Sequence, residues 1–202
     1  MERLVPEEKA FRVSAVLLAA GAGRRFGDGG KLLAPYAGGR LIDGALHLAL
    51  TAAVDEVVLV TGARGPEVAA YALAQSGPSR LKVVAAADWG DGLSASLRAG
   101  IRELGDADAA LVLLADMPRV PSAVLGPLVD AVRAGAAAAA PVFRGRRGHP
   151  VVFRAALFPQ LLALAGDQGA GRLLAGMGPD LALVEAPDDG VLYDVDTPGD
   201  VA

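Results

Sequence analysis

The stretch VSAVLLAAGAGRRFGDGGK, residues 13–31, joins a strand pattern to an unusual loop. Its first part, 13–20, is an apolar run that predicts a strand buried on both faces of a sheet. The loop that follows is rich in glycine and carries the cations Arg24, Arg25 and Lys31. Glycine lets the backbone approach a ligand closely, and successive N–H groups in such a turn can surround an anion. The stretch therefore predicts a buried strand whose next loop wraps a triphosphate.

The 202 residues are 53% hydrophobic, contain no cysteine and carry a net charge of −4. A chain of this length and composition can bury one sizeable core, so we expect a single domain over 1–202. The lack of cysteine excludes disulfides, thiolate metal sites and cysteine nucleophiles. The acidic balance argues against nucleic acid as a partner, so any anion site must be local.

The first residues, 1–11, are charged and lack the apolar stretch of a signal peptide. The apolar runs elsewhere are shorter than the roughly 20 residues that span a membrane. We therefore expect a cytoplasmic protein with no membrane partner.

Short apolar runs alternate with amphipathic stretches along the whole chain. Strands are expected at 13–20, 56–62, 81–87, 109–116, 137–143, 149–153, 181–186 and 191–195. Helices are expected at 41–54, 65–75, 93–103, 122–135, 155–164 and 168–176. This alternation predicts an α/β fold with a single doubly wound, mostly parallel sheet and helices on both faces. Ligands in such folds bind beyond the carboxyl ends of the strands, where the glycine-rich loop, DWGDG and DMP are expected to meet.

The glycine-rich loop differs from two common phosphate-binding loops. A P-loop requires Ser or Thr after its lysine, whereas Lys31 is followed by Leu32. A dinucleotide-binding loop requires its third glycine earlier than Gly27 and an acidic residue at the end of the next strand, which here ends in Thr61-Gly62. The loop therefore indicates a nucleotide site of a third kind.

Two aspartates are candidate metal ligands. Asp116 ends the apolar run at 109–116, where a carboxylate is costly unless it is paired or metal-bound, and Pro118 forces a turn directly after it. A carboxylate that faces a triphosphate is typically a Mg²⁺ ligand. Asp196 is our choice for the second ligand, with Asp194 in reserve. Each has an alternative role as the N-cap of the segment that follows it.

The loop LAAGAGRRFGDGGK resembles the signature of nucleotidyltransferases that activate sugars, terpenoid precursors and molybdopterin. With LLADMP, RRGHPVVF (146–153) and YDVDTPGD (193–200), the chain is similar to the molybdenum-cofactor cytidylyltransferases from Val13 to Val201. They belong to a wider family of molybdopterin nucleotidyltransferases that includes the guanylyltransferases of the same cofactor. The resemblance implies a nucleotide-diphospho-sugar transferase-like fold.

The resemblance also implies an activity. The protein would transfer CMP from CTP to the phosphate of molybdopterin, with or without bound molybdenum, and would release pyrophosphate. Mg²⁺ would be required, with Mn²⁺ able to substitute. Ala19-Ala20-Gly21 implies CTP over GTP, and a methyl group at Ala20 would narrow the base pocket.

The resemblance assigns roles to individual residues. Arg25, Lys31 and Asp116 are expected to act in catalysis, with Asp116 and Asp196 as metal ligands. Residues expected at the nucleotide are Ala19, Ala20, Gly21, Ala22, Gly23, Arg24, Gly92, Leu93 and Ser94. Candidates for contact with the acceptor are His149, Arg146 and Trp89. For these three, a structural histidine, a solvated turn and a packed tryptophan are the respective alternatives.

Two other functions remain open from the sequence. One is a guanylyltransferase or a transferase that acts on a different phosphorylated acceptor. The other is a nucleotide-binding chaperone that delivers the finished cofactor to a client molybdoenzyme. Both would use the same loop, so the sequence does not separate them.

Overall fold

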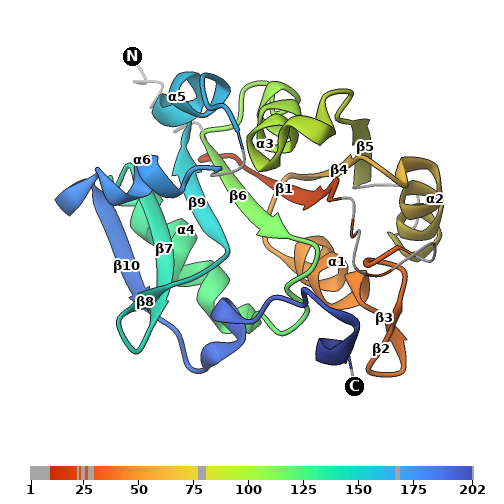
Figure 1. Cartoon of the computed structure of the whole chain (residues 1–202). Coiled ribbons are helices and arrows are strands. Elements are labelled where there is room, and N and C mark those ends of the chain that lie inside the picture. Colours follow the sequence, from red (N-terminus) through yellow and green to blue (C-terminus); the bar gives the residue numbers. More distant parts are fainter. Residues whose placement is uncertain are drawn as a thin grey trace, which may run out of the picture.

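The computed structural model describes residues 10–21, 23, 26, 30–76, 81–166 and 169–201. In this part of the chain an eight-stranded sheet runs through the molecule in the order β10-β7-β9-β6-β1-β4-β5, with β8 paired to β7 (Figure 1). The parallel strands are β1 (Val13–Ala19), β4 (Glu56–Thr61), β5 (Leu81–Ala85), β6 (Ala109–Leu114), β7 (Ala138–Phe143) and β10 (Leu181–Glu185). This architecture confirms the predicted doubly wound α/β fold.

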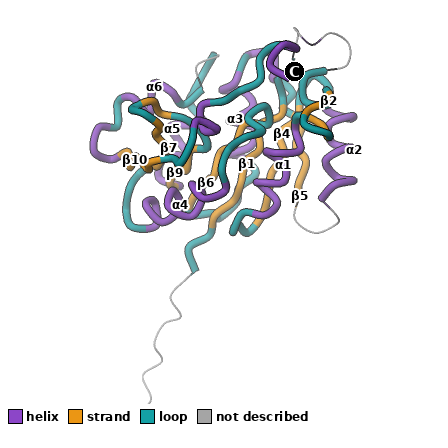
Figure 2. Tube along the Cα trace, turned by 90° about the horizontal axis from the view of Figure 1, so that it is seen from below, coloured by secondary structure: helices purple, strands orange, loops and turns teal. Residues whose placement is uncertain are grey.

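Helices cover both faces of the sheet, as the turned view in Figure 2 shows. The helices are α1 (Ile42–Thr51), α2 (Gly65–Ser76), α3 (Leu93–Arg102), α4 (Leu125–Arg133), α5 (Phe158–Leu162) and α6 (Gly171–Ala175). Alternate residues of β1 enter two hydrophobic clusters, because successive side chains of a strand point to opposite faces. The cluster with Leu17 contains side chains of α1, α2 and α4, and the cluster with Val16 contains side chains of α3, α5 and α6.

Strand β1 is central and buried at every position. It pairs in parallel with β4 on one side and β6 on the other, so Leu18 lies opposite both Val60 and Leu114. The carboxyl ends of these three strands therefore lie at one edge of the sheet. The loops that carry the candidate site residues leave from this edge.

Two antiparallel elements depart from the regular pattern. Residues 144–150 are too few for the crossover of about a dozen residues that a parallel neighbour needs. The chain instead makes β8 (Arg146–Arg147) and returns as β9 (Val151–Arg154), antiparallel to β6 and β7. A short hairpin of β2 (Pro35–Tyr36) and β3 (Gly39–Arg40), which the sequence analysis did not predict, follows the glycine-rich loop.

The strand predicted at 191–195 is wrong. The segment forms a 3₁₀ turn, Asp189–Leu192, and then runs on without sheet pairing. Val191 and Val195 are fully buried, which produces the apolar pattern of a strand. Its backbone binds neighbouring loops instead, since the N–H of His149 donates to the Val191 carbonyl at 2.9 Å.

None of the described helices is long and apolar enough to cross a bilayer.

Candidate functional site

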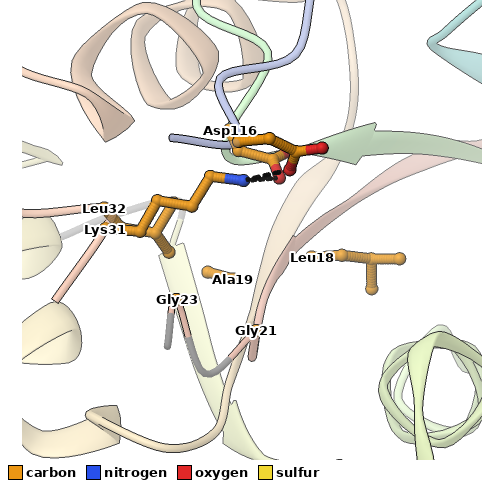
Figure 3. Close-up of a pocket in the computed structure, with 8 residues that line it drawn as sticks. Leu18, Ala19, Gly21, Gly23, Lys31, Leu32 and Asp116 are labelled. Atoms are coloured by element: carbon orange, nitrogen blue, oxygen red, sulfur yellow. Dashed lines mark hydrogen bonds and ion pairs between the residues drawn. The ribbon is translucent and has the colours of Figure 1, made fainter. Parts of the chain in front are cut away.

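A cleft of about 330 Å³ opens at the carboxyl end of β1. Its lining residues come from β1, the glycine-rich loop, the turn after β6 and the C-terminal segment (Figure 3). They are Leu18, Ala19, Gly21, Gly23, Lys31, Leu32, Asp116 and Asp196. The sheet edge where the sequence placed a ligand site therefore carries a concave, charged surface.

Lys31 connects the two candidate aspartates. Its Nζ lies 2.7 Å from Asp116 Oδ2 and 3.2 Å from Asp196 Oδ1, and Figure 3 shows the lysine side chain extended toward Asp116. Partial burial acts to lower the pKa of Lys31, but the charges and hydrogen bonds of Asp116 and Asp196 outweigh it and raise the pKa above its usual value. The lysine is therefore a full cation held between two carboxylates.

This arrangement fits a divalent metal whose ligands are shared between the protein and a nucleotide. Both carboxylates reach one ammonium nitrogen, so a single small cation can lie within reach of both. Among the described residues there is no group of three or more His, Cys, Asp or Glu side chains that could hold a metal ion, so two carboxylates are what the protein would offer and water or phosphate oxygens would be the other ligands. Mg²⁺ is usually bound by one or two carboxylates, with water and substrate phosphates as the remaining ligands.

Backbone hydrogen bonds hold the segments that carry Asp116 and Asp196 in place. The turn after β6 places Asp116 at the sheet edge, where the N–H of Ala115 donates to the Leu18 carbonyl at 3.0 Å. The carbonyl of Asp116 accepts a 3.1 Å hydrogen bond from the N–H of Val195. The segments that carry Asp116 and Asp196 are thus joined directly by their backbones.

Asp200, which the sequence analysis did not single out, supports Asp196. Its carboxylate accepts from the N–H groups of Asp196 and Thr197 and from the Thr197 hydroxyl, at 2.7–3.0 Å. These donors, those of Thr197 first, lower the pKa of Asp200. Asp200 therefore binds the backbone at the start of this turn, whereas the Asp196 side chain faces Lys31. The YDVDTPGD motif could have suggested this, because aspartate three residues after threonine is typical of a local turn.

Within the glycine-rich loop, there is no room for a side chain at Gly23. It has a φ of +55°, and a Cβ there would lie 2.6 Å from the Lys31 Cβ. Glycine thus allows the start of the loop to pack against Lys31. Ala22, Arg24 and Arg25 lie outside the described residues.

The expected nucleotide residues at α3 have different surroundings. Gly92 precedes the helix with a φ of +103°, and Leu93 is exposed at a second cavity. Ser94 is buried, and its hydroxyl donates to the Gly166 carbonyl.

Ala20 is buried rather than exposed in the cleft. It is 3% exposed and lies against Gly62, where an added Cβ would be 2.4 Å from the Ala20 carbonyl oxygen and 2.8 Å from its Cβ. Its methyl group therefore packs toward the end of β4. If this methyl group narrows a base pocket, it does so indirectly, by setting how the loop packs against β4.

A second cavity, of about 170 Å³, lies on the face of the sheet covered by α3 and α6. Its walls are mainly apolar, and it shares Leu18 with the charged cleft. His149 lines it with Arg147, and the His149 Nδ1 is enclosed without a hydrogen-bond partner among the described residues. Burial lowers the pKa of His149 to about 4, with Asp116 opposing the shift and Arg147 adding to it. This histidine is neutral at neutral pH.

The other acceptor candidates are not among the residues that line these two cavities. Arg146 is exposed on β8 and pairs with Phe143 of β7. Trp89 is half-buried and packs against the hydrophobic cluster on the α3 face. The contacts of Trp89 in this structure are therefore those of a packed tryptophan, which was its alternative role.

Arg64 lies beside the cleft and was missed by the sequence analysis. With Gly21 and Lys31 it lines a small hollow beside the main cleft. Its Nε is enclosed and has no hydrogen-bond partner in the described part of the chain. The signal was its position directly after β4, at the edge where ligands bind.

Residues 15–183 match the model of the MobA-like NTP transferase domain. The match covers most of the chain, so the protein belongs to this family, and its class is nucleotidyltransferase. This confirms the resemblance to the molybdopterin nucleotidyltransferase family.

Two characterised relatives are similar along nearly their whole lengths. The chain is 35% identical to the nicotine blue oxidoreductase of Paenarthrobacter nicotinovorans over 193 residues, which are 92% of each chain. It is 34% identical to the purine catabolism protein PucB of Bacillus subtilis over 189 residues, which are 91% of each chain.

The crystal structure of Rv0371c from Mycobacterium tuberculosis has a similar fold. It superposes with a TM-score of 0.78 at 27% identity, covering 95% of this chain and 96% of that one. A crystal structure of Rv0371c in complex with manganese superposes with a TM-score of 0.71 at 25% identity, covering 94% of this chain and 95% of that one.

Proposed function

We propose that the protein transfers CMP from CTP to the terminal phosphate of a molybdopterin-type cofactor with Mg²⁺ and releases pyrophosphate. The observation that carries the proposal is the convergence of Lys31, Asp116 and Asp196 beside Gly21 and Gly23 in one cleft. A cation, two carboxylates and an open glycine-rich backbone are the groups that a metal–triphosphate complex requires.

The transfer requires no general base. The attacking group is a phosphate oxygen of the acceptor, which is already anionic. It forms a new bond to the α-phosphorus of CTP, while the bond from that phosphorus to the bridging oxygen breaks and its electrons leave with pyrophosphate. The protein therefore accelerates the step by alignment and by neutralising charge.

The residues divide this task between them. Asp116 and Asp196 would hold the metal, which when bound would neutralise charge on the phosphates. Lys31 would move from the carboxylates to the leaving phosphates. The N–H groups of the glycine-rich loop would bind phosphate oxygens. Arg25 is expected to act there too, although it lies outside the described residues.

The finer points of the proposal have separate support. CTP is supported by the resemblance of Ala19-Ala20-Gly21 to the cytidylyltransferase branch, and a divalent metal by the manganese complex of Rv0371c. His149 and the apolar cavity beside the cleft are the candidates to receive the acceptor ring, because a neutral enclosed imidazole can hydrogen-bond without repelling a neutral heterocycle.

A redox function is a second candidate because one relative is a nicotine blue oxidoreductase. The loop after β1 lacks the regular spacing of a dinucleotide-binding loop, and β4 ends in Thr61-Gly62 where such folds place an acidic residue. These features favour nucleotidyl transfer over hydride transfer.

The test supplies purified protein with Mg²⁺, molybdenum-loaded cofactor and CTP, GTP, ATP or UTP in turn. We expect pyrophosphate release with CTP and a product heavier than the cofactor by one CMP, identified by mass. Asp116→Asn should abolish the product, and Asp130→Asn, at an exposed aspartate of α4, is the matched control.

Other outcomes would favour the other functions. A GMP-bearing product would indicate a guanylyltransferase. Binding of CTP without turnover in the presence of the cofactor would support the delivery chaperone for a client molybdoenzyme. Oxidation of NADH or NADPH by an added dye, with no pyrophosphate release, would support the redox function.

A further inference from the structure

The three charged residues of the cleft come from three separate segments of the chain. Lys31 lies 85 positions from Asp116 and 165 positions from Asp196. Lys31 starts the segment that leads to the β2–β3 hairpin, Asp116 follows β6, and Asp196 belongs to the C-terminal segment. Figures 1 and 2 both show the C-terminal segment beside the hairpin. A site that depends on their spacing needs a contact that joins all three segments.

Arg119 makes that contact. It lies three residues after Asp116, in the same turn. Its Nε donates a 2.7 Å hydrogen bond to the hydroxyl of Tyr36 in the hairpin. Its guanidinium carbon lies 3.9 Å from the ring centroid of Tyr193 in the C-terminal segment, within the range of a cation–π interaction.

Tyr193 connects Arg119 to the backbone of Asp196 through Asp200. The Tyr193 hydroxyl donates to the Asp200 carbonyl at 2.8 Å, and the Asp200 carboxylate accepts from the Asp196 N–H at 3.0 Å. The backbones of the Arg119 turn and the C-terminal segment are also in close contact, since a Cβ on Gly190 would lie 2.1 Å from the Arg119 carbonyl oxygen. The guanidinium is therefore placed to control how the C-terminal segment lies against the Asp116 turn.

We propose that Arg119 is a positioning residue that sets the separation of Asp116, Asp196 and Lys31 through Tyr36 and Tyr193. The inference rests on the proposed function, because it assumes that the two aspartates bind a divalent metal. Arg119 does not touch the metal or the nucleotide in this role. Its effect is on the geometry of the ligands.

The test measures metal affinity directly. Wild-type protein is titrated with Mn²⁺ alone, and the free ion is followed by electron paramagnetic resonance. Arg119→Gln should weaken Mn²⁺ binding by about tenfold, from the loss of a cation–π contact and a charged hydrogen bond. Tyr36→Phe, which removes a single hydroxyl, should weaken it by about threefold. Arg119→Lys should lie between Arg119→Gln and wild type, because the lysine retains a cation over the ring.

Arg133→Gln is the matched control. Arg133 is an exposed arginine on α4 that lies 5.7 Å from the ring of Phe11, away from the charged cleft. Its replacement should leave Mn²⁺ binding unchanged. The double variant Arg119→Gln, Tyr193→Leu should weaken binding by less than the product of the two single effects, because both changes remove the shared cation–π contact.

The outcomes separate the inference from the proposed function. If Asp116→Asn does not weaken Mn²⁺ binding, the metal site and the inference both fail. If Asp116→Asn does weaken it but Arg119→Gln and Tyr36→Phe bind as wild type does, only the role of Arg119 is overturned. Circular dichroism checks the fold of each variant, and Tyr36→Phe decides the matter if Arg119→Gln is unfolded.

Discussion

Lys31 shows how a single side chain can organise the charged cleft. Its ammonium group is partly buried, which by itself would be unfavourable, and two carboxylates compensate for the lost hydration. The same carboxylates would hold the metal in the proposed reaction. Lysine and metal therefore compete for one position, and the lysine becomes available to the phosphates when the metal binds.

Lys31→Met tests this competition. Transfer of CMP should fall by about a hundredfold or more, the scale of losing a group that stabilises developing charge. Binding of Mn²⁺ alone should be tighter, because the competing cation is gone. Turnover by pyrophosphate release and Mn²⁺ binding by titration measure the two effects.

Lys82→Met is the control for charge alone, because Lys82 pairs with Glu103 at 2.7 Å on the exposed side of β5. It should retain wild-type turnover. A Lys31→Met protein with wild-type turnover would remove Lys31 from the reaction.

At the level of elements, close backbone packing places the turn that carries Asp116. A Cβ added to Gly44 in α1 would lie 2.2 Å from the carbonyl oxygen of Pro118. Helix α1 thus contacts the turn after β6 at a distance that only glycine permits. A backbone carbonyl cannot rotate away as a flexible side chain can, so this contact constrains the turn.

Gly44→Ala should destabilise the fold by about 1–3 kcal/mol, the usual cost of overpacking. The added methyl must push α1 away from the Asp116 turn, so Mn²⁺ binding should weaken too. The free energy of unfolding from urea denaturation and the Mn²⁺ titration are the measurements.

Gly126→Ala is the matched helix variant, since nothing lies within 4 Å of a Cβ at this position of α4. It should be neutral or slightly stabilising, because alanine is the better helix former. Equal effects of the two substitutions would contradict the packing argument.

At the scale of the whole molecule, the buried His149 makes stability depend on pH. Its pKa in the folded protein is about 4, below the usual value of 6.5. As the pH falls below 6.5, the unfolded chain therefore binds a proton that the folded protein does not bind. The contribution of neutral His149 to stability is fully present at pH values above 6.5, its pKa in the unfolded chain, and is lost as the pH falls toward 4.

His149 should therefore contribute a loss of about 2 kcal/mol in the free energy of unfolding between pH 7.5 and pH 5. His149→Gln should reduce the pH dependence by about this amount, whereas His47→Gln, on the exposed side of α1, should not. Urea denaturation at the two pH values measures it. An unchanged pH dependence in His149→Gln would show that the imidazole takes up a proton as readily in the folded protein as in the unfolded chain.

Much of the fold and part of the site could be predicted from the sequence because they depend on local pattern. The apolar runs at 13–20 and 109–116 became β1 and β6, and the rule for parallel sheets places Lys31 and Asp116 at their carboxyl ends. The prediction failed at 191–195, because burial of Val191 and Val195 against loops leaves the same apolar pattern as a strand.

The sequence by itself determined the alternation of strands and helices, the glycine-rich loop and the kinds of charge that meet at one sheet edge. Only the tertiary structure decided that Lys31 lies between Asp116 and Asp196 and that Arg119 lies between two tyrosines. The physical reason is range. Strand and helix patterns arise from neighbours a few residues apart, whereas these contacts join segments far apart in the chain and depend on how α1 and the C-terminal segment pack against the edge of the sheet.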